Sequence, residues 1–310
     1  MGSSLIEQAA QRLEQLRQAG VHLPDEATLH HAKGVPHVAA APEDGGGEPE
    51  PQFHSKRVDL DLDALAVQGF LTPQAPRSQL ADQYRVIKRP LIKNAVGKGA
   101  STINHANLIM VTSALPGEGK SFSSLNLAIS IAAELDHTVM LVDADVARPS
   151  VLRMLGLPPG PGLLDVLENS ADMSDVLLRT NIDKLTILPS GTPHPKATEL
   201  LASDAMSNLL DDMAKRYPDR IIIFDSPPLL LTTEARVLAT HMGQIVVVVE
   251  ADKTLQSAVQ QAIGTIEHCP VKMLLLNRAR SSDGAPYGYG YGYGQAHGYG
   301  YGHEDAPSKG

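Results

Sequence analysis

The stretch Ala114-Leu-Pro-Gly-Glu-Gly-Lys-Ser121 decides the fold of this chain. An apolar run at residues 108–113 precedes it, and a helical pattern follows it directly. This context is typical of a Walker A loop, in which glycines let several backbone N–H groups turn inward and a helix N-terminus adds its positive end. The usual pattern begins with glycine, so Ala114 requires a negative φ. The loop therefore predicts a binding site for a triphosphate.

The residues of this loop have distinct predicted roles. We expect Lys120 to bridge the β- and γ-phosphates and the Ser121 hydroxyl to ligate Mg²⁺. The nucleotide is expected to contact Pro116, Gly117, Glu118, Gly119, Lys120, Ser121 and Phe122. A glycine-rich turn with a surface lysine is the alternative interpretation, which the flanking strand and helix patterns disfavour.

Two further apolar runs end in aspartate. Residues 139–142 lead into Asp143-Ala-Asp145, and residues 221–224 lead into Asp225. In a parallel sheet these ends open at the same edge as the loop. Three carboxylates that converge there would repel one another unless a cation lay between them, which gives Mg²⁺ with ATP a physical role. An aspartate at a strand end is also a common helix N-cap, but that alternative weakens when all three accompany the loop.

Short aliphatic runs alternate with helix-length segments through the middle of the chain. The predicted strands are 108–113, 138–143, 185–189, 220–225, 245–250 and 271–276. The predicted helices are 78–88, 120–135, 197–216 and 254–267. Pro90 is expected to end the first of these helices. The alternation predicts an α/β fold with a doubly wound, mostly parallel sheet of the P-loop NTPase type.

The composition divides the chain into four regions. An amphipathic N-terminal helix is expected at 1–20 and a flexible linker rich in proline and glycine at 21–57. The P-loop domain follows at 58–280, and a Tyr/Gly-rich tail at 281–310 is expected to be disordered because it lacks residues that could build a core. The N-terminal helix is equally suited to pack on its own domain or on a partner.

Charge and cysteine content exclude several classes of function. The 310 residues carry a formal net charge of −9, which disfavours nucleic acid as the main partner. The one cysteine, Cys269, excludes an internal disulfide, suits a reducing compartment and is expected to be buried. No apolar run approaches the ~20 residues that span a bilayer, so we expect a cytoplasmic chain that does not itself cross the membrane.

The combined motifs resemble those of the bacterial tyrosine kinases of polysaccharide export, specifically the exosortase-associated tyrosine autokinases. The resemblance runs from about Asp59 through the tail. It is carried by the Walker A loop, by Val-Asp-Ala-Asp at 142–145 as a second Walker motif, by Ile-Ile-Phe-Asp at 222–225 as Walker B, and by the terminal tyrosines. The resemblance implies an ATP-dependent protein-tyrosine kinase that regulates exopolysaccharide synthesis or export.

The same resemblance implies roles for individual residues. Lys120 and Ser121 would hold phosphate and Mg²⁺, Asp145 and Asp225 would place the metal, and Asp143 would receive the tyrosyl proton. Asn277 follows the last predicted strand, where related ATPases often place an adenine-contacting Asn. A turn residue fits that position equally well.

The sequence departs from the family pattern at two places. The second Walker motif of the family commonly continues to an arginine, but Ala147 holds that position and Arg148 follows. A helix before the P-loop often carries Glu-x-x-Arg-x-x-Arg for ring assembly, and here the stretch reads Asp82, Arg85 and Lys88. Basic residues of this region could pair with a neighbouring subunit, with phosphate or with solvent; they are Arg85, Lys88, Arg89, Lys93 and Lys98.

The tail is the predicted substrate. Its phosphoacceptors are expected to be Tyr287, Tyr289, Tyr291, Tyr293, Tyr299 and Tyr301, which alternate mostly with glycine. An extended tail can reach the active site of an adjacent subunit, so we expect a homo-oligomer. The resemblance also implies a membrane-embedded chain-length regulator or co-polymerase as the activator, which would place the kinase at the periphery of the inner membrane. The alternative is a low-complexity tail whose tyrosines are merely adhesive.

Two other functions remain open from the sequence. A spatial-organising ATPase resembling the partitioning and division-site proteins shares this core, but its signature lysine would stand at the position of Leu115. A non-catalytic nucleotide-sensing adaptor would bind a polysaccharide polymerase or chain-length regulator through the N-terminal helix. Phosphotyrosine formation with Mg²⁺-ATP separates a kinase from this adaptor.

Overall fold

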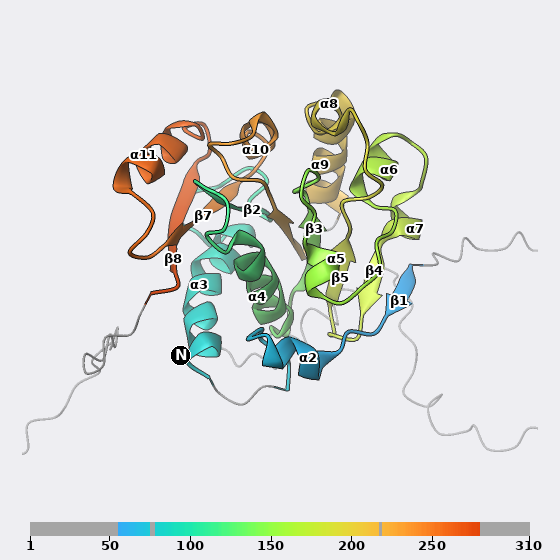
Figure 1. The fold of residues 1–310 in the computed structure, drawn as a ribbon, viewed down its shortest axis with the longest axis horizontal. Helices are drawn as coiled ribbons and strands as arrows, with labels where there is room; N and C mark the ends of the chain where they lie inside the picture. The colour runs from blue at the N-terminus through green and yellow to red at the C-terminus, as the bar shows by residue number, and fades with distance from the viewer. Residues whose placement is uncertain (1–54, 75–77, 217–218, 280–310) are drawn as a thin grey trace, which may run out of the picture. The chain divides into compact units, whose positions relative to one another are not determined.

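The computed structural model describes residues 55–74, 78–216 and 219–279, and within them one sheet of eight strands forms the centre (Figure 1). The strand order is β1-β4-β5-β3-β6-β2-β7-β8, and every neighbouring pair is parallel except β4 with β5. The strands are β1 Lys56–Val58, β2 Leu108–Ser113, β3 Thr138–Asp143, β4 Leu178–Thr180, β5 Leu185–Leu188, β6 Arg220–Asp225, β7 Gln244–Glu250 and β8 Val271–Asn277. This confirms the predicted doubly wound, mostly parallel α/β fold.

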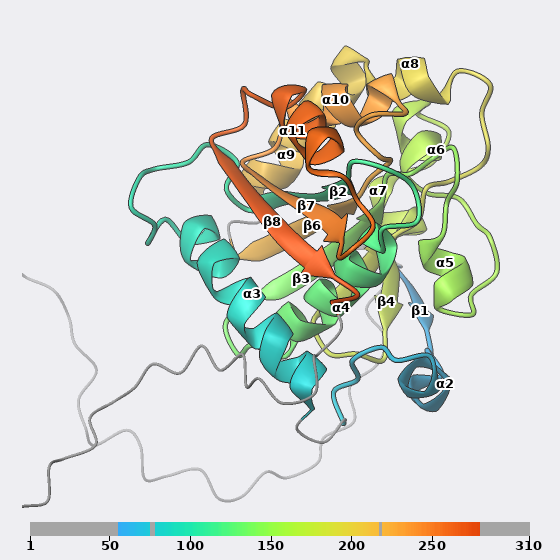
Figure 2. The same cartoon turned by 60° about the vertical axis from the view of Figure 1, so that its left-hand side comes forward.

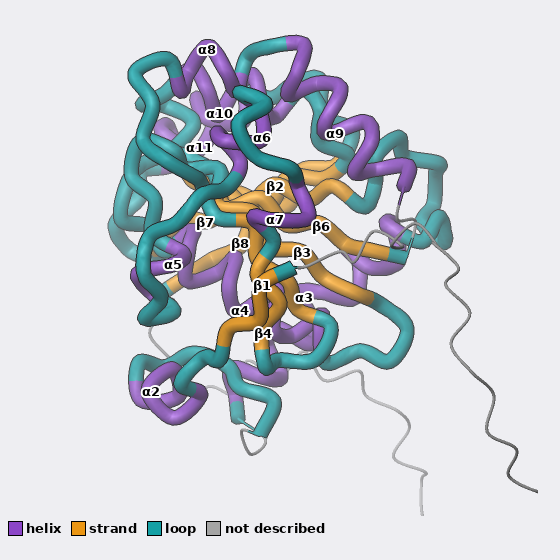
Figure 3. Tube along the Cα trace, turned by 90° about the vertical axis from the view of Figure 1, so that its right-hand side faces the viewer, coloured by secondary structure: helices purple, strands orange, loops and turns teal. Residues whose placement is uncertain are grey.

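Helices cover both faces of the sheet, and Figure 3 shows the strands between the two layers. One face packs on α2 Leu62–Val67, α3 Gln79–Ala95, α4 Lys120–Ala132 and α5 Val151–Met154. The other face packs on α6 Leu163–Leu167, α7 Met173–Val176, α8 Ala197–Leu201, α9 Asp204–Arg216, α10 Thr233–Ala239 and α11 Gln256–Gly264. In Figure 2, β8 lies in front, with α3 on one side of it and α11 on the other.

The central strands are buried on both faces, which explains their continuous apolar sequence. In β2, Leu108 and Met110 belong to the core under α9 and α10, whereas Ile109 and Val111 belong to the core under α3 and α4. Cys269 is a buried free thiol, as expected. Among the described residues, no helix is both long enough and apolar enough to cross a bilayer.

Several elements of the fold differ from the sequence prediction. The segment 197–216 forms two helices rather than one, because the Ser203 hydroxyl accepts the backbone N–H of Met206 at 3.3 Å and starts α9 afresh. The helix predicted at 254–267 is shorter and spans Gln256–Gly264. The short strands β1 and β4 were not predicted, and β1 begins within the stretch that we assigned to the linker. The predicted N-terminal helix and tail lie outside the described residues.

The predicted stop of α3 at Pro90 is wrong, because the helix continues to Ala95. A proline inside a helix removes one backbone hydrogen bond and costs ~3 kcal/mol. Contacts beyond the proline offset this cost. Leu91 is fully buried, its carbonyl accepts Gln244 Nε2 at 3.0 Å, and Asn94 Nδ2 donates to Gln244 Oε1 at 2.9 Å. Tertiary anchoring of the last turn therefore overrides the local preference.

The predicted basic patch on this helix is also incomplete. Lys88 is 5% exposed, and its Nζ donates to the carbonyl oxygen of Ser130 and lies 2.6 Å from Glu134 Oε1. Arg85 pairs with Asp82 on the same helix. Lys88 thus joins α3 to α4 and is not available to a neighbouring subunit or to a phosphate.

Candidate active site

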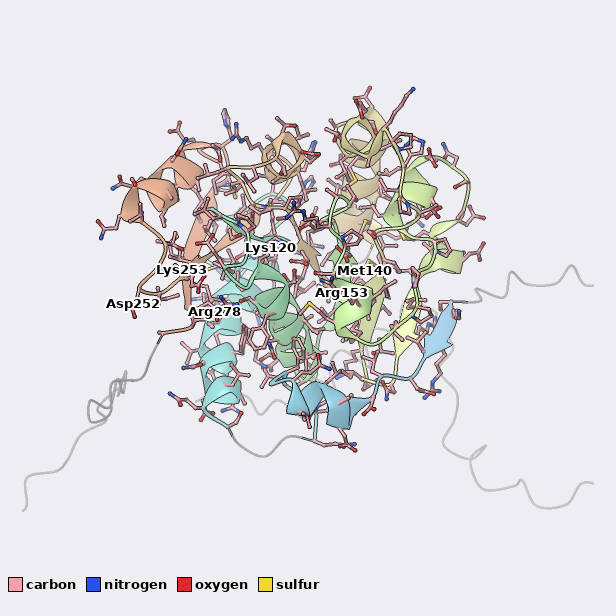
Figure 4. All side chains as sticks on the ribbon, viewed as in Figure 1. Lys120, Met140, Arg153, Asp252, Lys253 and Arg278 are labelled. Atoms are coloured by element: carbon pink, nitrogen blue, oxygen red, sulfur yellow. The ribbon has the colours of Figure 1, made fainter. Side chains whose placement is uncertain are left out.

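The sheet topology brings the predicted site residues to one edge. The P-loop leaves the end of β2, between β6 and β7, and leads into α4, where Lys120 is the first helical residue (Figure 4). Asp143 ends β3 and Asp225 ends β6, and the two are direct neighbours across this parallel pair. Carboxyl ends of parallel strands share one edge of a sheet, so the loop and the aspartates meet as predicted.

The P-loop has the backbone conformation that an anion cradle requires. Gly117 and Gly119 adopt positive φ angles of 86° and 94°, which favour glycine strongly. Ala114 is not among the described non-glycine residues with positive φ. It therefore has the backbone conformation that alanine requires at this position, where the usual pattern has glycine. Gly119 is the N-cap of α4, and no side chain caps it. The first N–H groups of the helix are therefore free to bind an anion.

Lys120 is held by an aspartate in this structure. Its Nζ lies 2.6 Å from Asp145 Oδ2, and both side chains are largely buried, at 12% and 6% exposure. The backbone N–H of Arg148 donates to Asp145 Oδ1 at 3.2 Å. Asp145 thus neutralises Lys120 and sets its position, and a phosphate that binds the lysine would compete with this carboxylate.

Asp225 is fully buried, and only one of its two carboxylate oxygens is hydrogen-bonded among the described residues. Its Oδ1 accepts the Ser124 hydroxyl at 3.1 Å, whereas Oδ2 has no hydrogen-bond partner among the described residues. Burial raises the pKa of Asp225 to about 6, although the charge of Lys120 and the hydroxyls of Ser121 and Ser124 oppose the shift. A cation bound beside Asp225 would lower this pKa and favour the ionised carboxylate.

Asp143 also has one hydrogen-bonded and one unpartnered carboxylate oxygen among the described residues. Its Oδ2 accepts two backbone N–H groups at the start of α5, from Ser150 at 3.0 Å and Val151 at 2.9 Å. Its Oδ1 is buried without a partner among the described residues. Burial, followed by the charge of Asp225, raises the pKa of Asp143 to about 7. One oxygen is fixed by α5, and the other is free to accept a proton or a cation.

Two oxygen groups at this edge of the sheet fit part of a magnesium shell. Mg²⁺ prefers oxygen ligands and usually combines one or two carboxylates with waters and substrate phosphates. The unpartnered oxygen of Asp225 and the Ser121 hydroxyl are ligands of this type, and Ser121 Oγ accepts the Ser150 hydroxyl at 2.9 Å. The described residues hold no group of three or more His, Cys, Asp or Glu side chains that would bind a metal alone. The phosphates would have to complete the shell.

The other residues predicted to contact the nucleotide have different surroundings in the structure. Pro116 is exposed on the loop. The Phe122 ring packs on Phe70, with ring centroids 5.1 Å apart, so that side chain serves the core. The Glu118 side chain is buried, and Asn277 contacts the loop itself, donating to the Glu118 carbonyl oxygen at 2.9 Å. The six predicted phosphoacceptor tyrosines lie outside the described residues.

Sequence reasoning missed three residues of the site. Ser124 binds Asp225, Ser150 binds Ser121 and Asp143, and Thr254 donates its hydroxyl to Glu118. Ser124 lies one helical turn after Lys120, and that spacing was the available signal. Ser150 and Thr254 come from loops far from the P-loop in sequence, where no local pattern distinguishes them.

Comparison with known proteins gives one consistent family. The family model of ParA-type proteins, described as NUBPL iron-transfer P-loop NTPases, matches residues 104–276. Over 215 residues the chain is 32% identical to tyrosine-protein kinase YwqD of Bacillus subtilis (strain 168), a match that covers 69% of this chain and 87% of that protein. It is 34% identical over 185 residues to tyrosine-protein kinase CpsD of Streptococcus agalactiae, covering 58% of this chain and 79% of that protein.

A solved structure agrees with these relatives. The crystal structure of the chimerical protein CapA2B2 superposes with a TM-score of 0.59 at 28% sequence identity. The superposition covers 73% of this chain and 94% of that chain. The kinase domain of VpsO superposes with a TM-score of 0.53 at 28% sequence identity, over 66% of this chain and 100% of that chain, so a solved kinase domain agrees with the sequence relatives.

Proposed function

The chain belongs to the bacterial tyrosine-protein kinases, within the ParA-type P-loop NTPases, and on that premise we propose that it transfers the γ-phosphate of ATP to tyrosines of its own C-terminal tail. The transfer runs between subunits of a homo-oligomer. The acceptors are the tail tyrosines, Tyr287, Tyr289, Tyr291, Tyr293, Tyr299 and Tyr301.

The nucleotide is bound by the P-loop. Backbone N–H groups at the start of α4 and the Lys120 ammonium would hold the phosphates, and Ser121, Asp145 and Asp225 would hold Mg²⁺. The metal supplies charge stabilisation for the phosphoryl oxygens as the transition state forms. In this assignment the phosphates would replace Asp145 as the partner of Lys120, and Asp145 would then be available as a ligand of Mg²⁺.

Asp143 acts as the base. Its free Oδ1 receives the proton of a tyrosyl hydroxyl as the tyrosyl oxygen forms a bond to the γ-phosphorus and the bond from that phosphorus to the ADP oxygen breaks. A phenol has a reference pKa of ~10 and attacks poorly while protonated. Ser150 and Val151 keep Oδ2 engaged, so a single oxygen faces the acceptor.

The wider role follows from the family resemblance. The kinase works in the cytoplasm, at the periphery of the inner membrane, where a membrane-embedded chain-length regulator or co-polymerase activates it. Its phosphorylation state regulates exopolysaccharide synthesis or export. The segment 1–20, whose sequence predicts an amphipathic helix, is a candidate contact for the activator.

One observation carries the proposal. Two neighbouring strand ends bury Asp143 and Asp225, at 1% and 0% exposure, and each keeps an unpartnered oxygen. Buried carboxylates without partners are costly unless a ligand completes them. Their place beside Lys120 and Ser121 supports a site for a metal-bound triphosphate and a proton acceptor.

Incubation of purified chains with Mg²⁺-ATP tests the proposal. We expect wild type to accumulate phosphotyrosine on peptides after Arg280, and Lys120→Met to lose this signal by about two orders of magnitude or more. The exposed Lys196→Met is the matched control and should retain wild-type activity. Phosphotyrosine on Lys120→Met at the wild-type level would refute the site.

The same experiment separates the two rival functions. A spatial-organising ATPase would hydrolyse ATP without labelling any tyrosine, and an adaptor would bind ATP without either reaction. Mass spectrometry of the labelled chain identifies which tail tyrosines are used. Label confined to tyrosines of the folded domain would contradict the tail as substrate.

A further inference from the structure

Glu118 poses an electrostatic problem for the P-loop. It lies between the two left-handed glycines of a loop that would bind a triphosphate, and a carboxylate directed at the phosphates would oppose their binding. In the structure Glu118 is 2% exposed. Its Oε2 accepts the Leu115 N–H at 2.6 Å, and its Oε1 accepts the Thr254 hydroxyl. Two donors therefore engage this charge.

Asn277 orients the peptide that follows. Its Nδ2 donates to the Glu118 carbonyl oxygen at 2.9 Å. The described backbone contains no cis peptide, and in a trans peptide the carbonyl and the next N–H point in opposite directions. A Glu118 carbonyl held toward the end of β8 therefore directs the Gly119 N–H away from β8. Inward N–H groups of this kind bind phosphate oxygens in a P-loop.

The contact between Asn277 and the loop is close. A Cβ atom placed on Gly119 would lie 2.0 Å from Asn277 Nδ2. The positive φ of Gly119 is a separate reason for glycine at this position. The P-loop and the end of β8 are therefore in tight contact at Gly119 and Asn277.

Both supporting residues belong to one connected frame, which we call the strand-end frame and define as residues 250–254 and 277–278. The Ala251 N–H donates to the Asn277 carbonyl at 2.9 Å, and Arg278 binds Glu250 at 2.9 Å. Lys253 binds the other oxygen of Glu250 at 3.1 Å. Figure 4 labels Lys253 and Arg278 in this frame, and Lys120 at the start of α4.

We propose that Asn277 and Thr254 are positioning residues that shape the P-loop through Glu118. Asn277 acts on its carbonyl, and Thr254 acts on its carboxylate. The inference rests on the proposed function only in that the P-loop binds nucleotide phosphates. It differs from the adenine contact expected for Asn277, because a positioning residue affects every phosphate ligand, whereas an adenine contact affects only adenine nucleotides.

Calorimetry with two ligands separates these roles. Mg²⁺-ATP and Mg²⁺-tripolyphosphate share the phosphate chain, but only the first has a base. We expect Asn277→Ala and Thr254→Val each to weaken both ligands by the same factor, roughly three- to tenfold, as for the loss of one hydrogen bond. Leu274→Ser on the same strand, at an exposed position, is the control and should change neither affinity.

Each other outcome overturns the inference. Asn277→Ala that weakens ATP alone would make Asn277 an adenine contact, and unchanged affinities in both variants would remove the positioning role while leaving the kinase proposal intact. A wild-type chain that binds neither ligand would overturn both proposals. Thr254→Val is nearly isosteric and lies in a loop, so it keeps the test valid if Asn277→Ala unfolds at a lower temperature.

Discussion

Asp143 presents two different oxygens to its surroundings. The N–H groups of Ser150 and Val151 fix one of them, and the other is buried without a partner among the described residues. Asp225, its neighbour on β6, also keeps one free oxygen, but Ser124 binds its other oxygen and the charge of Lys120 opposes the rise of its pKa. Burial raises the pKa of Asp143 to about 7, and its unpartnered oxygen is suited to accept a proton at neutral pH.

Replacement of Asp143 by Asn tests this division of roles. The amide oxygen still accepts the two N–H groups of α5, but the side chain no longer takes a proton. We expect phosphorylation of the tail to fall by roughly 10²–10⁴-fold, the usual contribution of a general base, while nucleotide affinity changes little. Phosphotyrosine rates and calorimetric affinities measure the two effects. The exposed Asp172→Asn is the control.

Two results would contradict the assignment of Asp143. Retention of activity within a few-fold of wild type would exclude a proton-accepting role. Loss of nucleotide binding in parallel with loss of activity would show that Asp143 serves the bound metal or the local fold instead.

At the scale of elements, α3 depends on its contacts with α4 and the sheet. Lys88 is a buried cation that bonds to the Ser130 carbonyl within α4 and to Glu134 just beyond the end of that helix. The hydrogen bond from Lys88 lowers the pKa of Glu134, and the charge of Lys88 adds to the effect. A buried charge that loses its partner is costly, so this pair contributes to stability through Lys88 more than through Glu134.

Glu134→Gln should therefore destabilise the domain in a pH-dependent way. The folded-state pKa of Glu134 lies below its unfolded value, so its contribution is present above the unfolded pKa and is lost as pH falls through the folded pKa. At pH 7 we expect a loss of ~1 kcal/mol, limited by solvent screening because the Glu134 side chain is 44% exposed. Urea unfolding from pH 7 downward measures the difference between variant and wild type, which should narrow below about pH 4.5.

A matched control isolates the ion pair. Glu267 is exposed, and Glu267→Gln should change stability by less than ~0.5 kcal/mol at every pH. A Glu134→Gln difference that stays constant across the pH range would show that packing, and not the charge, joins α3 to α4.

The elements that the sequence predicts well are those whose burial is complete. Residues 108–111 and 221–224 are continuously apolar, so composition alone marks them as central strands. The extension of α3 past Pro90 depends on Gln244, about 150 residues away, and the inward turn of Lys88 depends on Ser130. Contacts of this range leave no trace in a local pattern. The same limit applies to the site, where glycines and strand-end aspartates were predictable, but the bracing by Ser150 and Thr254 was not.

At the scale of the whole molecule, the folded domain fixes where the tail begins. Asn277 ends β8 in contact with the P-loop of its own chain. An extended chain spans about 3.3–3.6 Å per residue, so Tyr287 can reach ~35 Å from Asn277. A domain of this size has a radius of gyration of ~16 Å. The contour length of the tail therefore permits Tyr287 to reach the active site of its own chain or that of a neighbouring chain. A separate test must distinguish transfer within one chain from transfer between chains.

Mixed chains supply that test, because catalyst and acceptor can be placed on different molecules. Lys120→Met retains the tail but lacks the phosphate-binding lysine, and a chain deleted after Arg280 retains the site but lacks the tail. We expect label on the Lys120→Met chain only when both are present with Mg²⁺-ATP, at an initial rate that grows with the concentration of each. A deleted chain that also carries Lys120→Met should give no label. Transfer within one chain predicts the opposite: an unlabelled mixture and a wild-type rate per chain that does not change on dilution.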